Sequence, residues 1–455
     1  MVKGKILKIV KAPADWEIIQ ETGGRADISV EVIIEDNPAD DTDIELDFTF
    51  EEVYARIVNE ESGEFATPLT KFEKTGEIYG CKLCGVPCGG PYLLDFVLFN
   101  RAKNIESPLV AERRRHFCVG DVYIIAGQSN AAGMGKGFLT EKSEMGLHIL
   151  RNLDFWDIAS HPFNDFDYSK QSMFLAFAKH IKKRTGRPIG LIPASMGGSP
   201  LSRWIKDEGG DLYAKMLKSL KNNCISAKAV LWYQGCSDAW TSDSETEYLE
   251  RFKKFVDFLR EDLNNSDLPI FTFQLNRQKL KEKEDDKGYD FVREAQRRAA
   301  NEISNVYVLP TIDCLNMSDF IHNAKSSNLM LGERLAIQVL QKLYGIGIGA
   351  DAPEISKAYF VSEKEIRLKF SNVTEFLYAF NSSIADFPIT VEDGQGKIDI
   401  EDYIVSEDSI TLILKRDATG GVFVSGQTGS DPQNIIIDYG TQIPMLCFYK
   451  FKVER

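Results

Sequence analysis

Residue types that could carry out acyl-transfer chemistry stand just after short apolar runs of this chain. Ser129 lies in the segment GQSN (127–130), which directly follows the apolar run VYIIA (122–126). Asp319 stands three residues before His322, in a segment that follows the last such run. A D-x-x-H turn can hold a carboxylate against an imidazole, which fixes the histidine tautomer and stabilises the protonated ring. Together these residues are the types needed for a serine nucleophile, its base and an orienting acid.

Ser129 taken alone has other interpretations. A serine at a helix start caps free backbone N–H groups, and for an isolated serine this is the commoner role. A phosphate-binding loop fits poorly, because Gly137 rather than Ser or Thr follows Lys136 in GQSNAAGMGKG. The G-x-S-x-G nucleophile turn also fails, because Ala131 stands where its second glycine would be. The interpretation therefore depends on partners elsewhere in the chain.

An acyl-transfer site also needs preorganised hydrogen-bond donors for the oxyanion that forms. Gly197 and Gly198 follow one apolar run, and Gln234 follows the next. The glycines allow close backbone approach and offer N–H groups, and the glutamine carries a side-chain NH₂ group. The backbone N–H group of Ser129 is a further candidate. A turn glycine pair and a surface glutamine are the ordinary alternatives for these residues.

The elements that must position these residues are apolar runs, each short enough for a strand, within residues 118–347. The runs are VYIIA (122–126), PIGLIPA (188–194), AKAVLWY (227–233), PIFTFQL (269–275) and VYVLPTI (306–312). Helical patterns separate them: QSMFLAFAKHIKKRTG (171–186), DLYAKMLKSL (211–220), EYLERFKKFVDFLR (247–260) and FVREAQRRAANEI (291–303). This alternation predicts βαβ units, with a parallel sheet covered by helices on both faces. Ligands bind beyond the carboxyl ends of such strands, so the segments after the runs should meet at one edge.

The positions of the five histidines favour His322 as the base. His116 lies before the first run, and His180 falls within a helical pattern. His148 and His161 lie in a stretch that we expect to be loop-like. His322 is the histidine that follows a predicted strand.

The two flanks of this region have β patterns. The segments are ADISVEVII (26–34), DIELDFTF (43–50) and YLLDFVLF (92–99) before it, and KEIRLKF (364–370), SITLILK (409–415) and GVFVSGQ (421–427) after it. Turn clusters such as PCGGPY (87–92) separate them. We therefore expect an N-terminal β domain over 1–117, a catalytic α/β domain over 118–347 and a C-terminal β domain over 351–455.

Composition and charge exclude several classes of partner. The chain has 455 residues, a formal net charge of −14 and no prominent cluster of Lys and Arg, which argues against a nucleic-acid-binding protein. No apolar run reaches the roughly 18 residues of a membrane span. The start MVKGKILKIVKAPADW lacks the apolar segment of a secretory signal. We expect a cytoplasmic protein as written, or a secreted or periplasmic one if a signal has been trimmed.

The cysteines do not indicate a disulfide framework, since eight are spread over the whole chain. Cys81, Cys84 and Cys88 form the one close group, and His116 is the nearest histidine that could complete a zinc site. Reduced thiols in a β-rich segment are the favoured interpretation. We therefore expect no metal and no cofactor.

The blocks described above resemble those of the SGNH hydrolases, in particular carbohydrate esterases similar to sialate O-acetylesterase and to acetylxylan esterases. The matching segments are GDVYIIAGQSNAAGMG (120–135), ASMGGSPLSRW (194–204), LWYQGCSD (231–238), FVREAQRRA (291–299) and DFIHNAKSSNLMLGERLA (319–336). They span about half of the chain in the order of the family.

The resemblance implies a flavodoxin-like, three-layer α/β/α sandwich with about five parallel strands, flanked by N-terminal and C-terminal β-sandwich-like domains. It also implies metal-free deacetylation of an O-acetylated mono- or oligosaccharide. The nucleophile would be Ser129, with His322 as base and Asp319 as its orienting acid. The oxyanion hole would be formed by Ser129, Gly197, Gly198 and Gln234.

Two positions depart from the family pattern. Cys236 stands where the third block usually carries a glutamate, and Ala131 replaces a methionine common after G-Q-S-N. Neither change removes a member of the expected triad. Any role of the missing carboxylate in orienting a partner would be absent or moved.

Candidate sugar-binding residues lie near the same edge: Arg203, Trp204, Tyr233 and Trp240. Aromatic faces suit sugar rings, although Trp and Tyr beside strand ends are often core residues. Arg203 could meet a sialic-acid carboxylate or form a surface salt bridge. Two other functions stay open from the sequence: a carbohydrate-binding protein with an inert centre, and an esterase for acyl groups on molecules other than sugars.

Overall fold

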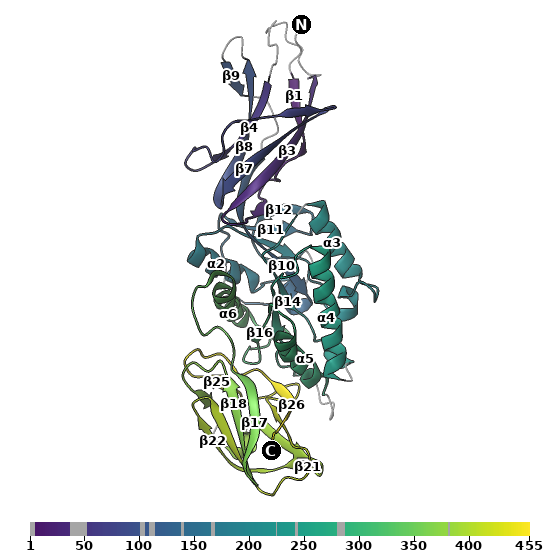
Figure 1. The fold of residues 1–455 in the computed structure, drawn as a ribbon, viewed down its shortest axis with the longest axis vertical. Coiled ribbons are helices and arrows are strands. Elements are labelled where there is room, and N and C mark those ends of the chain that lie inside the picture. The colour runs from purple at the N-terminus through teal and green to yellow at the C-terminus, as the bar shows by residue number, and fades with distance from the viewer. Residues whose placement is uncertain are drawn as a thin grey trace.

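The structure is a computed structural model, and it describes residues 5–36, 52–100, 105–108, 114–137, 141–164, 169–223, 225–241, 244–279, 287–380 and 383–455. In Figure 1 the chain passes from a β-rich N-terminal region, through a core of strands and helices, to a second β-rich region at its C-terminal end. The strand predicted at 43–50 lies outside the described residues.

The core is built on a sheet with the strand order β12 (Phe155–Ile158), β11 (Leu147–Arg151), β13 (Ile189–Pro193), β10 (Arg114–Gly127), β14 (Ala229–Tyr233), β15 (Ile270–Gln274) and β16 (Val306–Pro310). Neighbouring strands from β11 to β16 pair in parallel, and β12 pairs antiparallel with β11. β13, β14 and β15 are buried along their whole length, as expected for parallel strands covered on both faces. Each of the five predicted runs forms a parallel strand of this sheet.

The stretch around His148 is a strand and not the loop that we expected from the sequence, so that expectation is wrong. It forms β11, which pairs His148 with Gly190 of β13, and the chain then turns back as β12. β11 has five residues, LHILR, with a histidine and an arginine among them. So short and mixed a run does not stand out as a strand, although Leu147, Ile149 and Leu150 are all fully buried.

The helices form two groups. Figure 1 shows α2 (Phe174–Thr185) and α6 (Lys325–Tyr344) to one side of β10, β14 and β16, and α3 (Asp211–Asn222), α4 (Glu245–Asp262) and α5 (Gly288–Glu302) to the other. α4 shows why these segments fold as helices. Its buried residues Tyr248, Leu249, Phe252, Phe255, Val256 and Leu259 recur at helical spacing. The opposite face of α4 carries charged residues such as Glu250 and Lys254, which are exposed.

β10 connects the N-terminal region to the core as one continuous strand. Its first half pairs antiparallel with β8 (Gly89–Asn100) and parallel with β2 (Ile18–Gln20), and its second half lies in the central sheet. The other N-terminal strands are β1 (Lys5–Lys11), β3 (Arg25–Asp36), β4 (Glu52–Asn59), β5 (Thr70–Lys71), β6 (Glu73–Thr75), β7 (Ile78–Pro87) and β9 (Ile105–Pro108). A separate apolar cluster from β3, β4, β7 and β8 fills this region. The expected domain boundary at 117 falls within β10, and the division into three domains stays a prediction.

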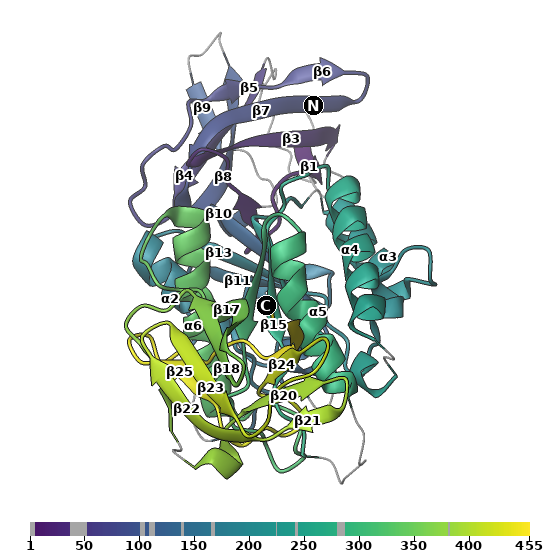
Figure 2. The same cartoon turned by 60° about the horizontal axis from the view of Figure 1, so that its bottom comes forward.

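The C-terminal region has two four-stranded sheets that share one apolar cluster. The first is β17 (Glu354–Ser362), β18 (Glu365–Ser371), β23 (Ser409–Leu414) and β22 (Ile400–Ser406), and the second is β21 (Gly396–Ile398), β20 (Ile389–Asp393), β24 (Phe423–Gly426) and β26 (Phe448–Lys452). Figure 2 shows the first sheet on the left and the labelled strands of the second on the right. A short pair, β19 (Leu377–Ala379) and β25 (Ile436–Asp438), completes the region.

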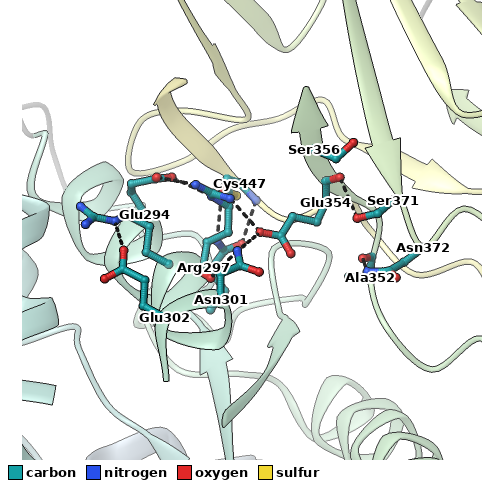
Figure 3. Close-up of polar contacts among 12 residues, drawn as sticks. Glu294, Arg297, Asn301, Glu302, Ala352, Glu354, Ser356, Ser371, Asn372 and Cys447 are labelled. Atoms are coloured by element: carbon teal, nitrogen blue, oxygen red, sulfur yellow. Dashed lines mark hydrogen bonds and ion pairs between the residues drawn. The ribbon is translucent and has the colours of Figure 1, made fainter. Parts of the chain in front are cut away.

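Buried polar contacts fasten the C-terminal region to the core at the carboxyl end of β15. The side-chain amide of Gln274, the last residue of β15, donates to the carbonyl of Cys447 (2.9 Å) and accepts from its N–H group (2.8 Å). Figure 3 shows Arg297 of α5 between Glu294 (3.0 and 2.7 Å) and Glu354 (2.7 Å). The C-terminal region therefore lies at the edge of the sheet where the predicted site residues gather.

Candidate active site

Ser129 lies at the carboxyl end of β10, where α1 (Ser129–Ala132) begins. Gly127 makes this turn possible, because its φ is +124° and a Cβ atom there would lie 2.3 Å from the carbonyl oxygen of Tyr233. The last residues of β10 can therefore lie against β14 before the chain turns sharply into the helix. Ser129 is 8% exposed, so it lies within the sheet edge rather than on an open surface.

The helix-cap interpretation of Ser129 does not hold. Gln128 is the N-cap residue of α1, and Ser129 is the first helical residue, whose carbonyl accepts the N–H group of Gly133 (3.1 Å). The first N–H groups of a helix have no partner within it. The Ser129 N–H group thus keeps its place as a candidate oxyanion donor.

Asp319 and His322 form the predicted hydrogen-bonded pair. The Nδ1–H of His322 donates to Oδ2 of Asp319 (2.9 Å), and Oδ1 of Asp319 accepts the backbone N–H groups of Ile321 (3.2 Å) and His322 (3.1 Å). Burial alone would raise the pKa of Asp319, but these hydrogen bonds hold it below its usual value. A charged Asp319 fixes Nδ1 of the imidazole as the donor, which leaves Nε2 able to accept a proton.

The side chain of Asn130 connects the serine segment to the histidine segment. Its Nδ2 donates to the carbonyl of Ile321 (3.4 Å), and its Oδ1 accepts the N–H group of Asn323 (3.0 Å). The residue that follows Ser129 therefore holds both neighbours of His322. The structure in this way brings Ser129, Asp319 and His322 to one place at the sheet edge.

Gly197 and Gly198 remain candidate donors. They form a turn after β13, with Gly197 half-buried, Gly198 exposed, and the φ of Gly198 at +68°. The turn is held next to the serine segment, since the Met196 N–H donates to the carbonyl of Gly127 (3.0 Å). Among the described residues, neither glycine N–H donates a hydrogen bond within the protein.

The prediction that the Gln234 amide is an oxyanion donor is contradicted by the structure. The side chain is fully buried, and its Nε2 donates to the carbonyl of Ser199 (3.1 Å) and to Oδ2 of Asp238 (2.5 Å). Its Oε1 accepts the hydroxyl of Tyr248 (2.9 Å). Because both amide hydrogens are used inside the protein, Gln234 is a structural residue.

Three of the four candidate sugar-binding residues also have structural roles. Arg203 forms a two-bond pair with Asp211 (3.0 and 2.6 Å), which is the surface salt bridge that the sequence left open. Trp204 is fully buried, and Tyr233, at 1% exposure, bonds through its hydroxyl to Thr311 (3.1 Å). Trp240 is 43% exposed and stays a candidate.

Cys236 is a buried, neutral group where the family has a carboxylate. Burial raises the pKa of its thiol to about 11, so it carries no charge at neutral pH. Arg293, which is fully buried on α5, has no carboxylate at position 236 to pair with, and it donates to four backbone carbonyls. They belong to Leu275 (2.9 Å), Asn276 (2.9 Å), Gly429 (2.6 Å) and Ser430 (3.4 Å). Arg293 thus joins the segment after β15 to the C-terminal region.

Asn276 and Asn323 are site residues that the sequence analysis missed. Asn276 Nδ2 donates to Oδ1 of Asn323 (2.8 Å), and Asn323 Nδ2 donates to the hydroxyl of Tyr233 (3.5 Å). Both asparagines are buried, and they support the turn that carries His322. Asn276 directly follows the fourth apolar run, so inspecting every residue after a strand would have found it.

Three further properties concern the described part of the chain. Within it, no group of three or more His, Cys, Asp and Glu side chains is arranged to hold a metal ion. No helix there is long and apolar enough to cross a membrane. The described cysteines, which include Cys81, Cys84 and Cys88, form no disulfide.

Comparison with known proteins identifies the family. The family described as "Carbohydrate esterase, sialic acid-specific acetylesterase" matches residues 119–341. A probable carbohydrate esterase of Arabidopsis thaliana is 31% identical over 241 residues, which are 47% of this chain and 88% of that protein. The chain belongs to this family of carbohydrate esterases. It is a carboxylic ester hydrolase of the class that acts on acetylated carbohydrates.

A solved structure shares the fold over nearly the whole chain. A carbohydrate acetylesterase from Xanthomonas citri is similar with a TM-score of 0.68 at 19% identity, covering 96% of this chain and 97% of that one. A structure from Arabidopsis thaliana has 28% identity and a TM-score of 0.44, and covers 49% of this chain and 98% of that one. The likeness to the Xanthomonas citri structure confirms the α/β core with additional β-rich regions.

Proposed function

We propose that the protein is a serine esterase that removes O-acetyl groups from carbohydrates, with Ser129, His322 and Asp319 as its catalytic triad. The observation that supports this most is the pair of hydrogen bonds through which Asn130 holds both neighbours of His322 beside Ser129. The Asp319–His322 hydrogen bond supplies an oriented base at the same edge.

In the first half of the reaction, His322 Nε2 takes the proton from Ser129 Oγ as that oxygen attacks the acetyl carbonyl carbon. A tetrahedral oxyanion forms, with the N–H groups of Ser129 and of Gly197 or Gly198 as its donors. The bond to the sugar oxygen then breaks, and His322 returns the proton to that oxygen. The products are the free sugar hydroxyl and an acetyl group on Ser129.

In the second half, water attacks the acetyl group while His322 Nε2 takes one of its protons. The bond to Ser129 Oγ breaks, and the serine regains its proton from His322. Acetate leaves and the enzyme is restored. The charged Asp319 stabilises the imidazolium that exists in both halves.

We also assign the core to the three-layer α/β/α sandwich of SGNH hydrolases. The support is the placement of α2 and α6 to one side of the labelled strands and of α3, α4 and α5 to the other (Figure 1).

Acetate release by the Ser129→Ala variant tests the proposal. On 4-nitrophenyl acetate and on O-acetylated sugars, turnover should fall by roughly 10⁴-fold or more, because the nucleophile is lost. Ser237→Ala is a matched control, since Ser237 is a half-buried serine at the same edge, and its turnover should stay within about threefold. Near wild-type turnover by Ser129→Ala would reject the assignment of the nucleophile.

The sugar is identified by a substrate panel. O-acetylated sialic acid, acetylated xylo-oligosaccharides and acetylated manno-oligosaccharides should be compared by acetate release. The substrate with the highest kcat/KM defines the sugar class. Equal rates on all three and on a simple acetate ester would favour an esterase of acyl groups outside sugars.

A further inference from the structure

The strand β19 and its flanking residues carry an aromatic side chain at every second position. Phe376, Tyr378 and Phe380 alternate with Leu377 and Ala379. Successive side chains of a strand point to opposite faces, so the three rings share one face. Leu377, on the other face, is 2% exposed, whereas the rings are 37%, 40% and 64% exposed. The outward face of this strand is therefore aromatic where polar residues are usual.

These rings form one connected surface with Tyr439, which follows β25 and is 47% exposed. Phe376 and Tyr439 stack with ring centroids 4.6 Å apart and an angle of 14°. Tyr378 meets Tyr439 at 5.9 Å and Phe380 at 5.2 Å, both edge to face. We call Phe376, Tyr378, Phe380 and Tyr439 the aromatic surface. Contiguous exposed apolar patches on soluble proteins often mark binding sites.

The aromatic surface is held rigidly from beneath. Asp438, which is fully buried at the end of β25, accepts the N–H groups of Thr374 (3.0 Å), Glu375 (3.2 Å) and Thr441 (3.0 Å), and the hydroxyl of Thr441 (2.7 Å). These bonds fix the two chain segments that carry Phe376 and Tyr439. A surface already ordered before binding loses little conformational entropy when a ligand binds.

A cavity of about 590 Å³ adjoins the aromatic surface, between α6 and the C-terminal region. Phe380 lines it together with Ile435 and Ile437, and Glu333, Thr441 and Gln442 supply hydrogen-bonding groups. Its volume lies within the range of small-molecule sites. Asp313, which also lines the cavity, lies six residues before Asp319 in the segment that leads to the catalytic pair.

We propose that the aromatic surface and this cavity bind an uncharged carbohydrate chain, apart from the acetyl ester that is cleaved. The proposal rests on the proposed function, since a carbohydrate esterase meets such chains as substrates. The C–H faces of sugar rings pack on aromatic rings, while their hydroxyls need donors and acceptors such as Gln442 and Glu333.

The charges of the cavity lining and of the whole chain favour a neutral glycan over an anionic sugar or a second copy of the chain. Arg334, the one cation among the lining residues of the cavity, is paired with Asp313 (2.7 Å), so Glu333 gives the lining its net negative charge. An anionic sugar would meet this acidic lining unfavourably. A second copy of the chain is disfavoured by the formal net charge of −14 on each molecule.

The test uses Phe380→Ala and Tyr439→Ala, singly and together, with Phe155→Ala as the control. Phe155, on the distant strand β12, is 54% exposed, which lies between the exposures of Phe380 and Tyr439. Each variant is combined with Ser129→Ala, and binding of acetylated and deacetylated xylo- and manno-oligosaccharides is measured by calorimetry. The same variants with Ser129 intact are assayed on 4-nitrophenyl acetate and on the acetylated oligosaccharides.

We expect the double variant to weaken oligosaccharide binding by about tenfold or more and to raise KM for the acetylated oligosaccharide similarly. Turnover of 4-nitrophenyl acetate should stay within about twofold of wild type, and Phe155→Ala should change neither quantity. Because binding is measured without turnover, it succeeds or fails independently of the esterase assignment. If one single variant fails to fold, the loss of oligosaccharide binding is measured with the other single variant alone.

Three results would overturn the inference. The first is that the wild-type chain binds neither type of neutral oligosaccharide. The second is that all variants bind them as wild type does. The third is a wild-type dimer in sedimentation experiments that the double variant converts to monomer, which would make the surface a contact between copies of the chain.

Discussion

His148 is a buried imidazole that couples stability to pH. Burial lowers the pKa of His148 to about 4 from its usual value of 6.5. At a pH above 6.5 the His148 ring is neutral whether the chain is folded or unfolded, so it adds no pH dependence to the free energy of unfolding. As pH falls from 6.5 towards 4, the unfolded chain binds a proton that the folded chain does not, and stability is lost. The full loss is roughly 3 kcal/mol.

His148→Gln should remove this part of the acid sensitivity. Urea unfolding at about pH 7 and about pH 4.5 should show a smaller loss of stability for this variant than for wild type. His180→Gln is the control, because His180 is half-buried on α2 and should lose stability as wild type does. Identical losses for His148→Gln and wild type would contradict the assignment of a neutral, buried ring.

For single residues, the position after a strand predicts which residues reach the sheet edge but not where their side chains point. His322 and Asp319 are three residues apart, so their hydrogen bond is local and could be predicted. Gln234 also reaches the edge, but Tyr248 and Asp238 bind its side chain inside the protein. That choice depends on a contact with α4, which no local pattern reveals.

Among the elements, the contact between α2 and α6 depends on Gly332. A Cβ atom at this position would lie 2.4 Å from the carbonyl oxygen of Met173 and 2.8 Å from Cβ of Ala176. α6 carries the chain away from the His322 turn, so its close packing on α2 helps to fix that turn. The absence of a side chain at Gly332 is therefore required by packing.

Gly332→Ala should destabilise the protein by about 1–3 kcal/mol, because the two helices must move apart. Gly394→Ala is the control, since the nearest atom to its added Cβ is the carbonyl oxygen of Thr419 at an ordinary 3.7 Å. Thermal unfolding should show a lower Tm for the first variant and little change for the second. Equal Tm values would show that the α2–α6 contact is not tight.

The strands with the strongest apolar runs could be predicted from the sequence, and the weakest could not. PIFTFQL and AKAVLWY correspond to β15 and β14, each fully buried. β11 lies between β12, with which it forms a hairpin, and β13, a parallel partner about 40 residues away. A five-residue strand of mixed polarity is identified by such a partner rather than by its own pattern.

For the whole molecule, the pairing of Arg297 with Glu294 and Glu354 is central to the docking of the C-terminal region (Figure 3). The Arg297 and Glu294 side chains are each 8% exposed and that of Glu354 is 14%. Removing the cation would leave two largely buried carboxylates without the positive charge that pairs them, although each keeps a neutral donor, Tyr449 N–H for Glu294 and the Asn301 amide for Glu354. Breaking a buried pair in this way costs about 3–5 kcal/mol.

Arg297→Leu should therefore lower the unfolding free energy by several kcal/mol, whereas Arg298→Leu should change it by about 1 kcal/mol or less. Arg298 is the matched control on the same helix, with a 32% exposed side chain paired to Glu302. Urea unfolding of both variants checks the difference. Similar stabilities would mean that the buried network does not hold the regions together.

The order of the β, α/β and β regions could be predicted from hydrophobic patterns alone, but not how they join. Gln274 and Cys447 meet through two hydrogen bonds although 173 residues separate them. Nothing near either residue in the sequence indicates the other. The continuity of β10 between the N-terminal region and the core is likewise a property of strand pairing rather than of composition.

An acetyl group on Ser129 would be detected by mass spectrometry of the protein quenched with acid during turnover of an acetylated oligosaccharide. We predict an acetyl group on the peptide that contains Ser129, and none in the Ser129→Ala variant. The label should disappear when the substrate is exhausted, because water completes the second half of the reaction. An acetyl group on another residue, or acetate release by Ser129→Ala at the wild-type rate, would show that Ser129 is not the nucleophile.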